Sequence, residues 1–188
     1  GVIDPSPERI SPKCTLFGEC GGCQYQHLDY GSQLEWKRNQ VRDSFERIAE
    51  VEFKINETIA SPKQYAYRSK LTPHFEKGNA DRAFKIGFLK QGTRRSLIDV
   101  EQCPIATEGI NQSLPDARTA VSDKKSSLKK GGTLLLRDTL IGVVQDPNEF
   151  VQERVGELTF QFRAGEFFQN NPFILPRLVD YVIKQSFP

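Results

Sequence analysis

In the stretch Cys14-Thr-Leu-Phe-Gly-Glu-Cys20-Gly-Gly-Cys23-Gln-Tyr-Gln-His27, three cysteines lie within ten residues, and the remaining cysteine of the chain is Cys103. Four thiolates are the number needed to hold a tetrahedral zinc ion or a cubane iron–sulfur cluster. Gly21 and Gly22 allow the backbone to approach a bound group and to point amide N–H groups at it. Our first hypothesis is therefore a metal centre, with these ligands: Cys14, Cys20, Cys23 and Cys103.

On the residues alone, three alternatives to an iron–sulfur cluster stay open: a zinc ion, disulfides and unrelated buried thiols. Zinc sites favour two separated Cys-x2-Cys pairs, so the three-plus-one arrangement favours a cluster without excluding zinc. Disulfides need an oxidising compartment, but the chain opens with no signal peptide, and four cysteines in 188 residues are not disulfide-dense. Unrelated buried thiols are the last interpretation. Because no apolar run approaches membrane-spanning length, we expect an intracellular protein that does not enter a membrane.

Positive charge is concentrated in the middle of the chain, although the formal net charge is only +2. Residues 61–103 carry nine Lys and Arg against four Asp and Glu, whereas residues 1–60 carry seven against ten and residues 104–188 carry ten against ten. A polyanion would be expected to dock on the middle segment. A solvated basic surface without a partner explains the same charges equally well.

Hydrophobic periodicity predicts an α+β fold that begins with a helix after the cysteine loop. From about residue 32 to residue 50, one face carries an apolar stripe, which we expect to pack on the core. Trp36, the single tryptophan, is interpreted as a core anchor. The stripe consists of Leu34, Val41, Phe45 and Ile48.

Residues 51–103 are predicted to form an antiparallel meander. Its strands are Tyr65–Phe75, Ala83–Leu89 and Arg94–Val100, with turns at Gly78–Asp81 and Gln91–Gly92. One face is apolar and aromatic, while the other is basic, which is typical of a surface that binds RNA phosphates and stacks bases. Packing in the core explains each aromatic residue taken singly. The candidate RNA-binding residues are Arg68, Lys70, His74, Arg94 and Arg95.

The last third of the chain mixes a polar segment with further strands and a helix. Residues 111–131, rich in lysine and small polar residues, are predicted to be a loop. Strands are predicted at Thr133–Arg137, Leu140–Val144 and from Leu158 onward. Asn171-Pro172 is a helix-start signal ahead of a helix over residues 174–183.

Three ordered motifs resemble the RNA 5-methyluridine methyltransferases, which use S-adenosylmethionine to methylate uracil C5. They are the cysteine loop, Glu101-Gln-Cys-Pro-Ile, and Phe167-Phe-Gln-Asn-Asn-Pro-Phe. The resemblance implies that the four cysteines ligate a [4Fe-4S] cluster, and that Gln169 lines the site of the cofactor and target base. Phe168 and Asn170 are weaker candidates. The residues of the last motif are most similar to those of the eukaryotic transfer-RNA branch of the family, whose target is the T-loop uridine.

The chain departs from this family in two respects. The family mechanism needs a cysteine thiolate that adds to uracil C6, but all four cysteines are assigned to the cluster. A Gly-rich turn that cradles the cofactor is also missing from the sequence. We therefore expect a fragment that is inactive by itself and has no catalytic residue of its own. Its expected parts are a linker from a missing N-terminal domain (1–13), the iron–sulfur loop and helix (14–50), a central β-rich RNA-facing domain (51–155) and the first strand and helix of a Rossmann-like methyltransferase domain (156–188).

Rival functions remain open beside a tRNA uracil-C5 methyltransferase. One is a fragment of a ribosomal-RNA uracil-C5 methyltransferase, and another is a metal-stabilised RNA-binding module without enzymatic ancestry. Electron transfer is disfavoured because a single cluster in a basic chain has no evident redox partner. The sequence indicates no oligomeric state and no particular subcellular compartment.

Overall fold

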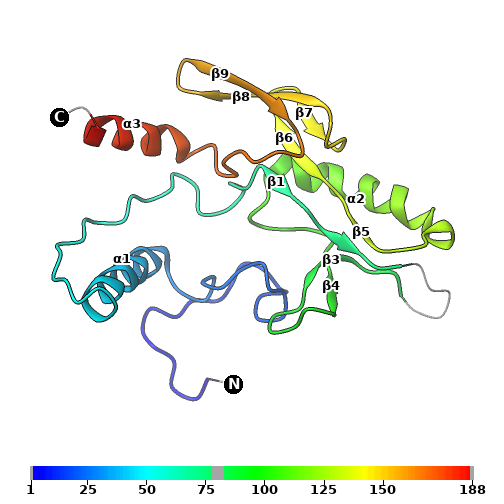
Figure 1. The fold of residues 1–188 in the computed structure, drawn as a ribbon. Coiled ribbons are helices and arrows are strands. Elements are labelled where there is room, and N and C mark those ends of the chain that lie inside the picture. Colours follow the sequence, from blue (N-terminus) through cyan, green and yellow to red (C-terminus); the bar gives the residue numbers. More distant parts are fainter. Residues whose placement is uncertain (1, 78–82, 187–188) are drawn as a thin grey trace. The chain divides into compact units, whose positions relative to one another are not determined.

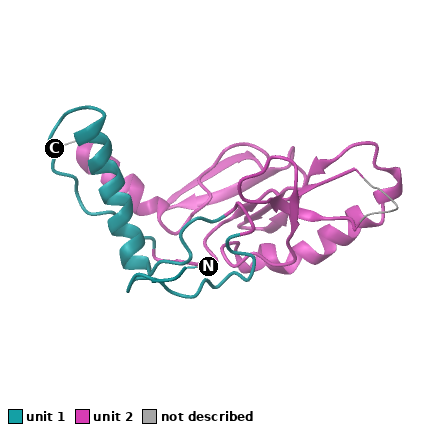
Figure 2. Cartoon of the chain, turned by 90° about the horizontal axis from the view of Figure 1, so that it is seen from below, with its two compact units in different colours: residues 1–18, 23–61 teal, residues 19–22, 62–188 magenta. Residues whose placement is uncertain are grey.

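The computed structural model describes residues 2–77 and 83–186, and Figure 1 shows the order of their helices and strands. The predicted turn at Gly78–Asp81 lies outside the described residues. The chain divides into two compact units, coloured separately in Figure 2. Unit 1 contains residues 1–18 and 23–61, and unit 2 contains residues 19–22 and 62–188.

Unit 1 contains one long helix, α1 (Tyr30–Arg47), which confirms the helix predicted after the cysteine loop. Asp29 caps its N-terminus, because its carboxylate accepts hydrogen bonds from the Ser32 backbone N–H at 2.9 Å and the Ser32 hydroxyl at 2.6 Å. The irregular segment that follows is tied back to the helix by two hydrogen bonds. Thr58 Oγ1 donates to the Leu34 carbonyl, and the Ser61 N–H donates to the Tyr30 hydroxyl, each at 2.8 Å.

The apolar stripe of α1 is not packed on a core, so that part of the prediction is wrong. Ile48 is 83% exposed, Val41 and Phe45 are also exposed, and α1 has no buried residue. Trp36 is 53% exposed and is therefore not a core anchor. A stripe is buried only where a second apolar layer faces it. From the segment after α1, the ring of Phe53 stacks on Phe45, with the ring centroids 5.7 Å apart.

The described residues of unit 2 form nine short strands in three antiparallel sheets together with helices, which confirms a mixed helix and antiparallel-sheet fold. The sheet orders are β1-β6-β7, β4-β3-β2-β5 and β8-β9. The strands are β1 (Lys70–Leu71), β2 (His74–Phe75), β3 (Ile86–Leu89), β4 (Leu97–Asp99), β5 (Gly132–Thr133), β6 (Leu136–Thr139), β7 (Gly142–Val144), β8 (Phe150–Val155) and β9 (Leu158–Arg163).

The predicted meander is confirmed where β2, β3 and β4 pair as consecutive neighbours. The prediction of one continuous strand over Tyr65–Phe75 is wrong, because β1 pairs with β6 in a different sheet from β2. Pro73 separates the two strands, and proline has no N–H to continue a ladder. Its carbonyl instead accepts a hydrogen bond from the Leu134 N–H at 2.9 Å.

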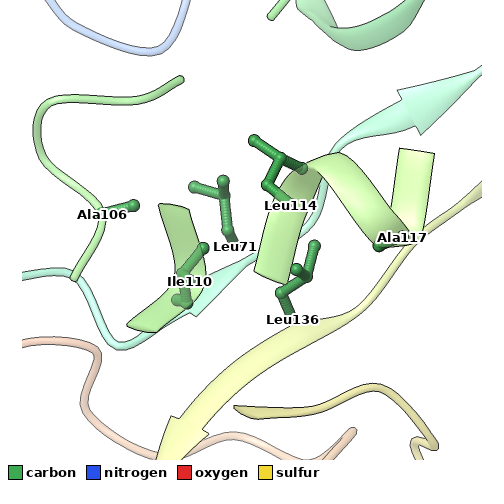
Figure 3. Packing of buried hydrophobic residues seen from close by; sticks show 6 residues of the cluster. All are labelled: Leu71, Ala106, Ile110, Leu114, Ala117 and Leu136. Carbon is green, nitrogen blue, oxygen red and sulfur yellow. The ribbon is translucent and has the colours of Figure 1, made fainter. Parts of the chain in front are cut away.

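The predicted loop over residues 111–131 is wrong, because α2 (Glu108–Ser122) forms there, followed by the short 3-10 helix Lys125–Ser127. Pro115 lies inside α2 and costs the helix about 3 kcal/mol. Each fully buried aliphatic side chain contributes about 1.5–3 kcal/mol, so the apolar face outweighs this cost. Figure 3 shows the hydrophobic cluster that α2 helps to form in unit 2. This cluster consists of Leu71, Ala106, Ile110, Leu114, Ala117 and Leu136.

The C-terminal part contains the β8-β9 hairpin and helix α3 (Leu175–Ser186), so the predicted β9 strand and the final helix are confirmed. Asn171 Oδ1 accepts hydrogen bonds from the N–H groups of Phe173 at 3.1 Å and Ile174 at 3.3 Å, as the helix-start signal predicts. The predicted boundary at residue 156 lies in the turn between β8 and β9. The Rossmann-like start therefore stays a prediction. Among the helices of the described residues, none is long and apolar enough to cross a membrane.

Candidate functional site

The cysteine loop of unit 1 is closed at its base by backbone pairing. An antiparallel bridge joins Arg9 to Leu28, and the Ile10 N–H donates to the His27 carbonyl at 2.9 Å. Within the loop the chain runs through successive turns, and the Phe17 N–H donates to the Cys14 carbonyl at 3.1 Å. Cys14 and Cys23, the two cysteines of the loop that belong to unit 1, are half-buried.

Gln26 is the most buried residue of this loop, at 7% exposure. Its Oε1 accepts a hydrogen bond from the Cys14 backbone N–H at 3.0 Å. Its Nε2 is buried without a hydrogen-bond partner in the described part of the chain, and so is Nδ1 of His27. An unsatisfied buried donor costs about 1–3 kcal/mol, and a group rich in acceptor sulfurs would remove that cost. The loop thus contains two buried side-chain nitrogens, on Gln26 and His27, that have no hydrogen-bond partner among the described residues.

Cys20 and Cys103 belong to unit 2, where each is held by local structure. Cys20 forms an antiparallel bridge with Lys90, and the next residue, Gly21, donates its N–H to the Leu89 carbonyl at 2.9 Å. A Cβ at Gly21 would lie 3.0 Å from that carbonyl oxygen, so glycine allows the close approach.

The backbone of Cys103 is clamped by Asn111 of α2. Asn111 Oδ1 accepts from the Cys103 N–H at 2.9 Å, and Asn111 Nδ2 donates to the Cys103 carbonyl at 3.0 Å and to the Ala106 carbonyl at 3.3 Å. Sequence reasoning missed this residue because it assigned the segment to a loop. Among the described residues, no three His, Cys, Asp or Glu side chains are grouped to hold a metal ion, so the metal centre stays a prediction.

The candidate RNA-binding residues occupy three different places in unit 2. Arg68 is half-buried, and its Nε donates to the Lys70 carbonyl at 3.0 Å. His74 is exposed on β2, with Nδ1 2.8 Å from Thr133 Oγ1. Arg94 and Arg95 are exposed in the connection between β3 and β4. The two arginines of this connection are thus the most accessible of the set.

Half-buried Lys70 belongs to a cluster of charged residues that sequence reasoning missed. Its Nζ donates to the carbonyls of Gly165 at 2.9 Å and Glu166 at 3.2 Å. Arg137, its partner across β1 and β6, is fully buried, and donates from Nε to the Ala164 carbonyl and from Nη2 to the Glu166 carbonyl, each at 2.7 Å. Four hydrogen bonds from two cations therefore fix the turn over residues 164–166.

Burial dominates the ionisation of this cluster. It lowers the pKa of Lys70, and the neighbouring charge of Arg137 lowers it further. Burial also lowers the pKa of Arg137 and raises the pKa of Glu153 on β8, while the attraction between these two charges partly opposes both shifts. Glu153 is thus the acidic counterpart of a buried cation. No local pattern in Leu134-Leu-Leu-Arg137 distinguishes this arginine from an exposed one.

Gln169 follows this fixed turn and is exposed. The preceding Phe168 stacks on Phe162 of β9, with ring centroids 4.5 Å apart and planes 9° apart. The carbonyl of the following Asn170 accepts from the Ser69 N–H at 2.8 Å. Gln169 is therefore presented to solvent between two anchored neighbours, where its carboxamide can both donate and accept hydrogen bonds.

Comparison with known proteins identifies relatives of the chain. No family model matches it. It is 41% identical, over 98% of its length, to "tRNA (uracil(54)-C(5))-methyltransferase" of Schizosaccharomyces pombe, and 29% identical, over 96%, to the protein of the same name from Saccharomyces cerevisiae. A Pyrococcus abyssi protein of that name is 30% identical over 95% of the chain. The chain spans 37%, 38% and 53% of the lengths of these relatives.

A solved structure shows the same fold. The crystal structure of Pyrococcus abyssi tRNA (uracil-54, C5)-methyltransferase in complex with S-adenosyl-L-homocysteine matches 97% of the chain and 52% of its own chain, with a TM-score of 0.64 and 18% identity. Over nearly all of its length, the chain is thus similar to part of proteins named as tRNA uracil-C5 methyltransferases, which are enzymes. This similarity confirms the resemblance found in the motifs.

Proposed function

We propose that the protein acts in the S-adenosylmethionine-dependent methylation of uracil C5 in tRNA, at the T-loop uridine. The 188 residues supply the cluster-binding and RNA-binding portion of that activity. The observation that carries the proposal is the 41% identity, over 98% of the chain, to a relative named for uracil 54 of tRNA. No step of the chemistry is assigned to a cysteine of this chain, because each has a proposed role as a metal ligand.

The proposed metal centre is a [4Fe-4S] cluster. Its ligands come from a short loop and from one distant position, so the bound cluster closes a long stretch of chain and removes conformational freedom from the unfolded state. This role supports folding and requires no change of redox state. The four proposed ligands are Cys14, Cys20, Cys23 and Cys103.

Gln169 is proposed to contact S-adenosylmethionine and the target uracil. Its exposed carboxamide matches the donors and acceptors on a uracil edge, and the turn held by Lys70 and Arg137 fixes the backbone that leads to it. The sulfonium cofactor, when bound, supplies the methyl group.

The first prediction concerns the metal content. We expect the 188-residue chain, purified without oxygen, to be brown, with a broad charge-transfer band near the border of the visible and ultraviolet ranges. Elemental analysis should find iron and acid-labile sulfide in equal amounts, as a [4Fe-4S] cluster requires. A colourless protein that carries stoichiometric zinc would contradict the cluster and support the zinc interpretation.

The second prediction concerns RNA binding. Arg94→Ala and Arg95→Ala should each weaken binding to a T-arm hairpin several-fold, and each should reduce the slope of log affinity against log salt by about 1, because one phosphate contact is lost. Titrations at several salt concentrations measure both effects. Arg154→Ala serves as the matched control, since Arg154 is exposed on β8 outside the candidate set.

The same titrations separate the rival substrates. A tRNA-directed protein should bind the T-arm hairpin more tightly than a ribosomal-RNA hairpin of equal length and charge. If Arg94→Ala and Arg95→Ala bind each hairpin as tightly as the control Arg154→Ala does, the assignment of Arg94 and Arg95 to RNA binding is wrong. A clear preference for the ribosomal hairpin would favour the ribosomal-RNA alternative.

A further inference from the structure

Three strands of unit 2 end together at one edge of the sheet β4-β3-β2-β5 (Figure 1). Phe75 of β2 pairs with Ile86 of β3 on one side and with Gly132 of β5 on the other. Four exposed lysines lie within three residues of these pairs, although they come from three separate parts of the chain. We call this set the lysine surface, and it consists of Lys77, Lys85, Lys129 and Lys130.

Packing around the ring of Phe75 fixes this end of the sheet. The ring of Phe84 lies against it, with the ring centroids 6.3 Å apart. A Cβ at Gly132 would lie 2.6 Å from the Phe75 ring, and a Cβ at Gly131 would lie 2.5 Å from the Phe75 carbonyl oxygen. Glycine at both positions therefore lets this segment press against β2. The backbone at Lys130, the residue before the two glycines, is thus held beside β2.

The positive charge of the lysine surface is not neutralised within the described part of the chain. No ion pair between described residues involves any of its four lysines. Glu76 is the one acidic residue in segments 75–77, 83–86 and 129–133, all of which the structure describes. Cations gathered on one surface repel each other and attract a polyanion. The lysine surface is therefore suited to a partner with many negative charges.

The chemistry of the lysine surface favours a nucleic-acid backbone over a membrane or a protein. Among the described residues, none of the exposed large apolar side chains lies in those three segments. Membrane surfaces are bound by basic residues with apolar side chains beside them, and protein interfaces have an apolar or aromatic centre. Phosphates require only cations, and lysine binds them as a point charge that reads no base sequence. The same sheet also presents His74, a candidate RNA-binding residue, from β2.

We propose that the lysine surface binds the phosphate backbone of a helical stem in the substrate RNA, and thereby adds affinity without sequence specificity. The inference rests on the proposed function, because it takes RNA as the substrate. Lys85 precedes β3, whereas Arg94 and Arg95 follow it. At about 3.3 Å per residue, the backbone from Lys85 to Lys90 spans about 16 Å. An RNA that contacts both ends of β3 must therefore be extended, as a stem is.

A double substitution tests the lysine surface. Lys85→Gln/Lys130→Gln removes one cation from each of two segments and keeps long, polar side chains. Lys37→Gln/Lys54→Gln is the matched control, because it removes the same charge from exposed lysines of unit 1. Lys85→Arg/Lys130→Arg retains both charges and should bind RNA as the wild type does. Circular dichroism of each variant checks that the fold is kept.

The measurement is a titration of the 188-residue chain with RNA at several salt concentrations. Two probes are used, a T-arm hairpin and a blunt-ended RNA duplex with the same number of phosphates. We expect Lys85→Gln/Lys130→Gln to weaken binding to both probes about tenfold, and to reduce the slope of log affinity against log salt by about 2, because two phosphate contacts are lost. The control should keep the slope of the wild type.

The outcomes separate this inference from the proposed function. Equal losses on hairpin and duplex support a contact with the stem, whereas a loss on the hairpin alone would overturn it. If Lys85→Gln/Lys130→Gln matches the control on both probes while Arg94→Ala weakens binding to the hairpin, the inference is wrong and the proposed function stands. If the wild type binds neither RNA, the proposed RNA binding and the inference both fall. Polyglutamate is a third probe, and a loss confined to it would assign the surface to an acidic protein instead.

Discussion

Replacing Arg137 with methionine is expected to destabilise unit 2 by about 3 kcal/mol or more, because two hydrogen bonds from a charged donor, each contributing about 1.5–3 kcal/mol, are lost. The guanidinium is fully buried and satisfies the carbonyls of Ala164 and Glu166. Methionine fills similar volume but donates no hydrogen bond, and it leaves the carboxylate of Glu153 without its compensating charge. Chemical denaturation at pH 7, followed by far-ultraviolet circular dichroism, measures the free energy of unfolding.

The pH dependence of this loss has a definite sign. In the wild type, burial holds the pKa of the Glu153 carboxyl above its ordinary value of 4.5. The proton therefore binds the folded state more tightly than the unfolded state. The stability that this proton contributes is fully present below pH 4.5 and is lost as the pH rises through the folded pKa. Arg137→Met removes the attraction that opposes this shift, and so raises the folded pKa further. The destabilisation should therefore be larger at pH 7 than at pH 4.

Two further variants test the cause of the effect. Adding Glu153→Gln to Arg137→Met should recover part of the lost stability, because no uncompensated charge then remains buried. Arg154→Met, one residue from Glu153 but exposed, should change the free energy of unfolding by less than about 0.5 kcal/mol. A loss of equal size in Arg137→Met and Arg154→Met would contradict a special role for the buried cluster.

The correct sequence predictions are those that depend on local chemistry. The α1 helix follows from apolar spacing, and Asp29 then fixes its first turn through Ser32. The turn at Gln91–Gly92 forms as predicted, because Gly92 adopts a positive φ of 73° that glycine accepts freely. In each case the deciding interaction joins residues close in sequence, so the pattern of residue types contains the information.

The predictions that are wrong depend on partners distant in the sequence. Whether the α1 stripe is buried is decided by the residues that face it, and Phe53, which stacks on Phe45, is itself 62% exposed. α2 forms despite Pro115 because Leu71 and Leu136 complete its core. Arg137 is buried because carbonyls 27 and 29 residues away accept its hydrogen bonds. For the candidate site, the cysteines and Gln169 could be named from motifs, but Asn111 and Gln26 could be assigned only from the structure.

Replacing Cys103 with serine is expected to abolish the [4Fe-4S] cluster. This residue is proposed as the single ligand contributed from outside the loop, and serine does not provide a soft thiolate. Iron and sulfide content, together with the visible spectrum of anaerobically purified protein, measure the loss. Because the proposed cluster would bind only the folded state, its loss should also lower the midpoint of thermal unfolding.

Asn111→Ala tests whether the cysteine must be positioned as well as present. The substitution keeps the thiol but removes the hydrogen bonds to both the N–H and the carbonyl of Cys103. We expect partial occupancy of the cluster and a loss of metal affinity of about 10–100-fold, as is typical when a residue that orients a metal ligand is removed. Gln112→Ala is the matched control, because Gln112 is the exposed neighbour on the same helix. Full iron content in Cys103→Ser would show that Cys103 is not a ligand. Equal metal affinity of Asn111→Ala and Gln112→Ala would show that the hydrogen bonds from Asn111 to Cys103 serve the fold alone.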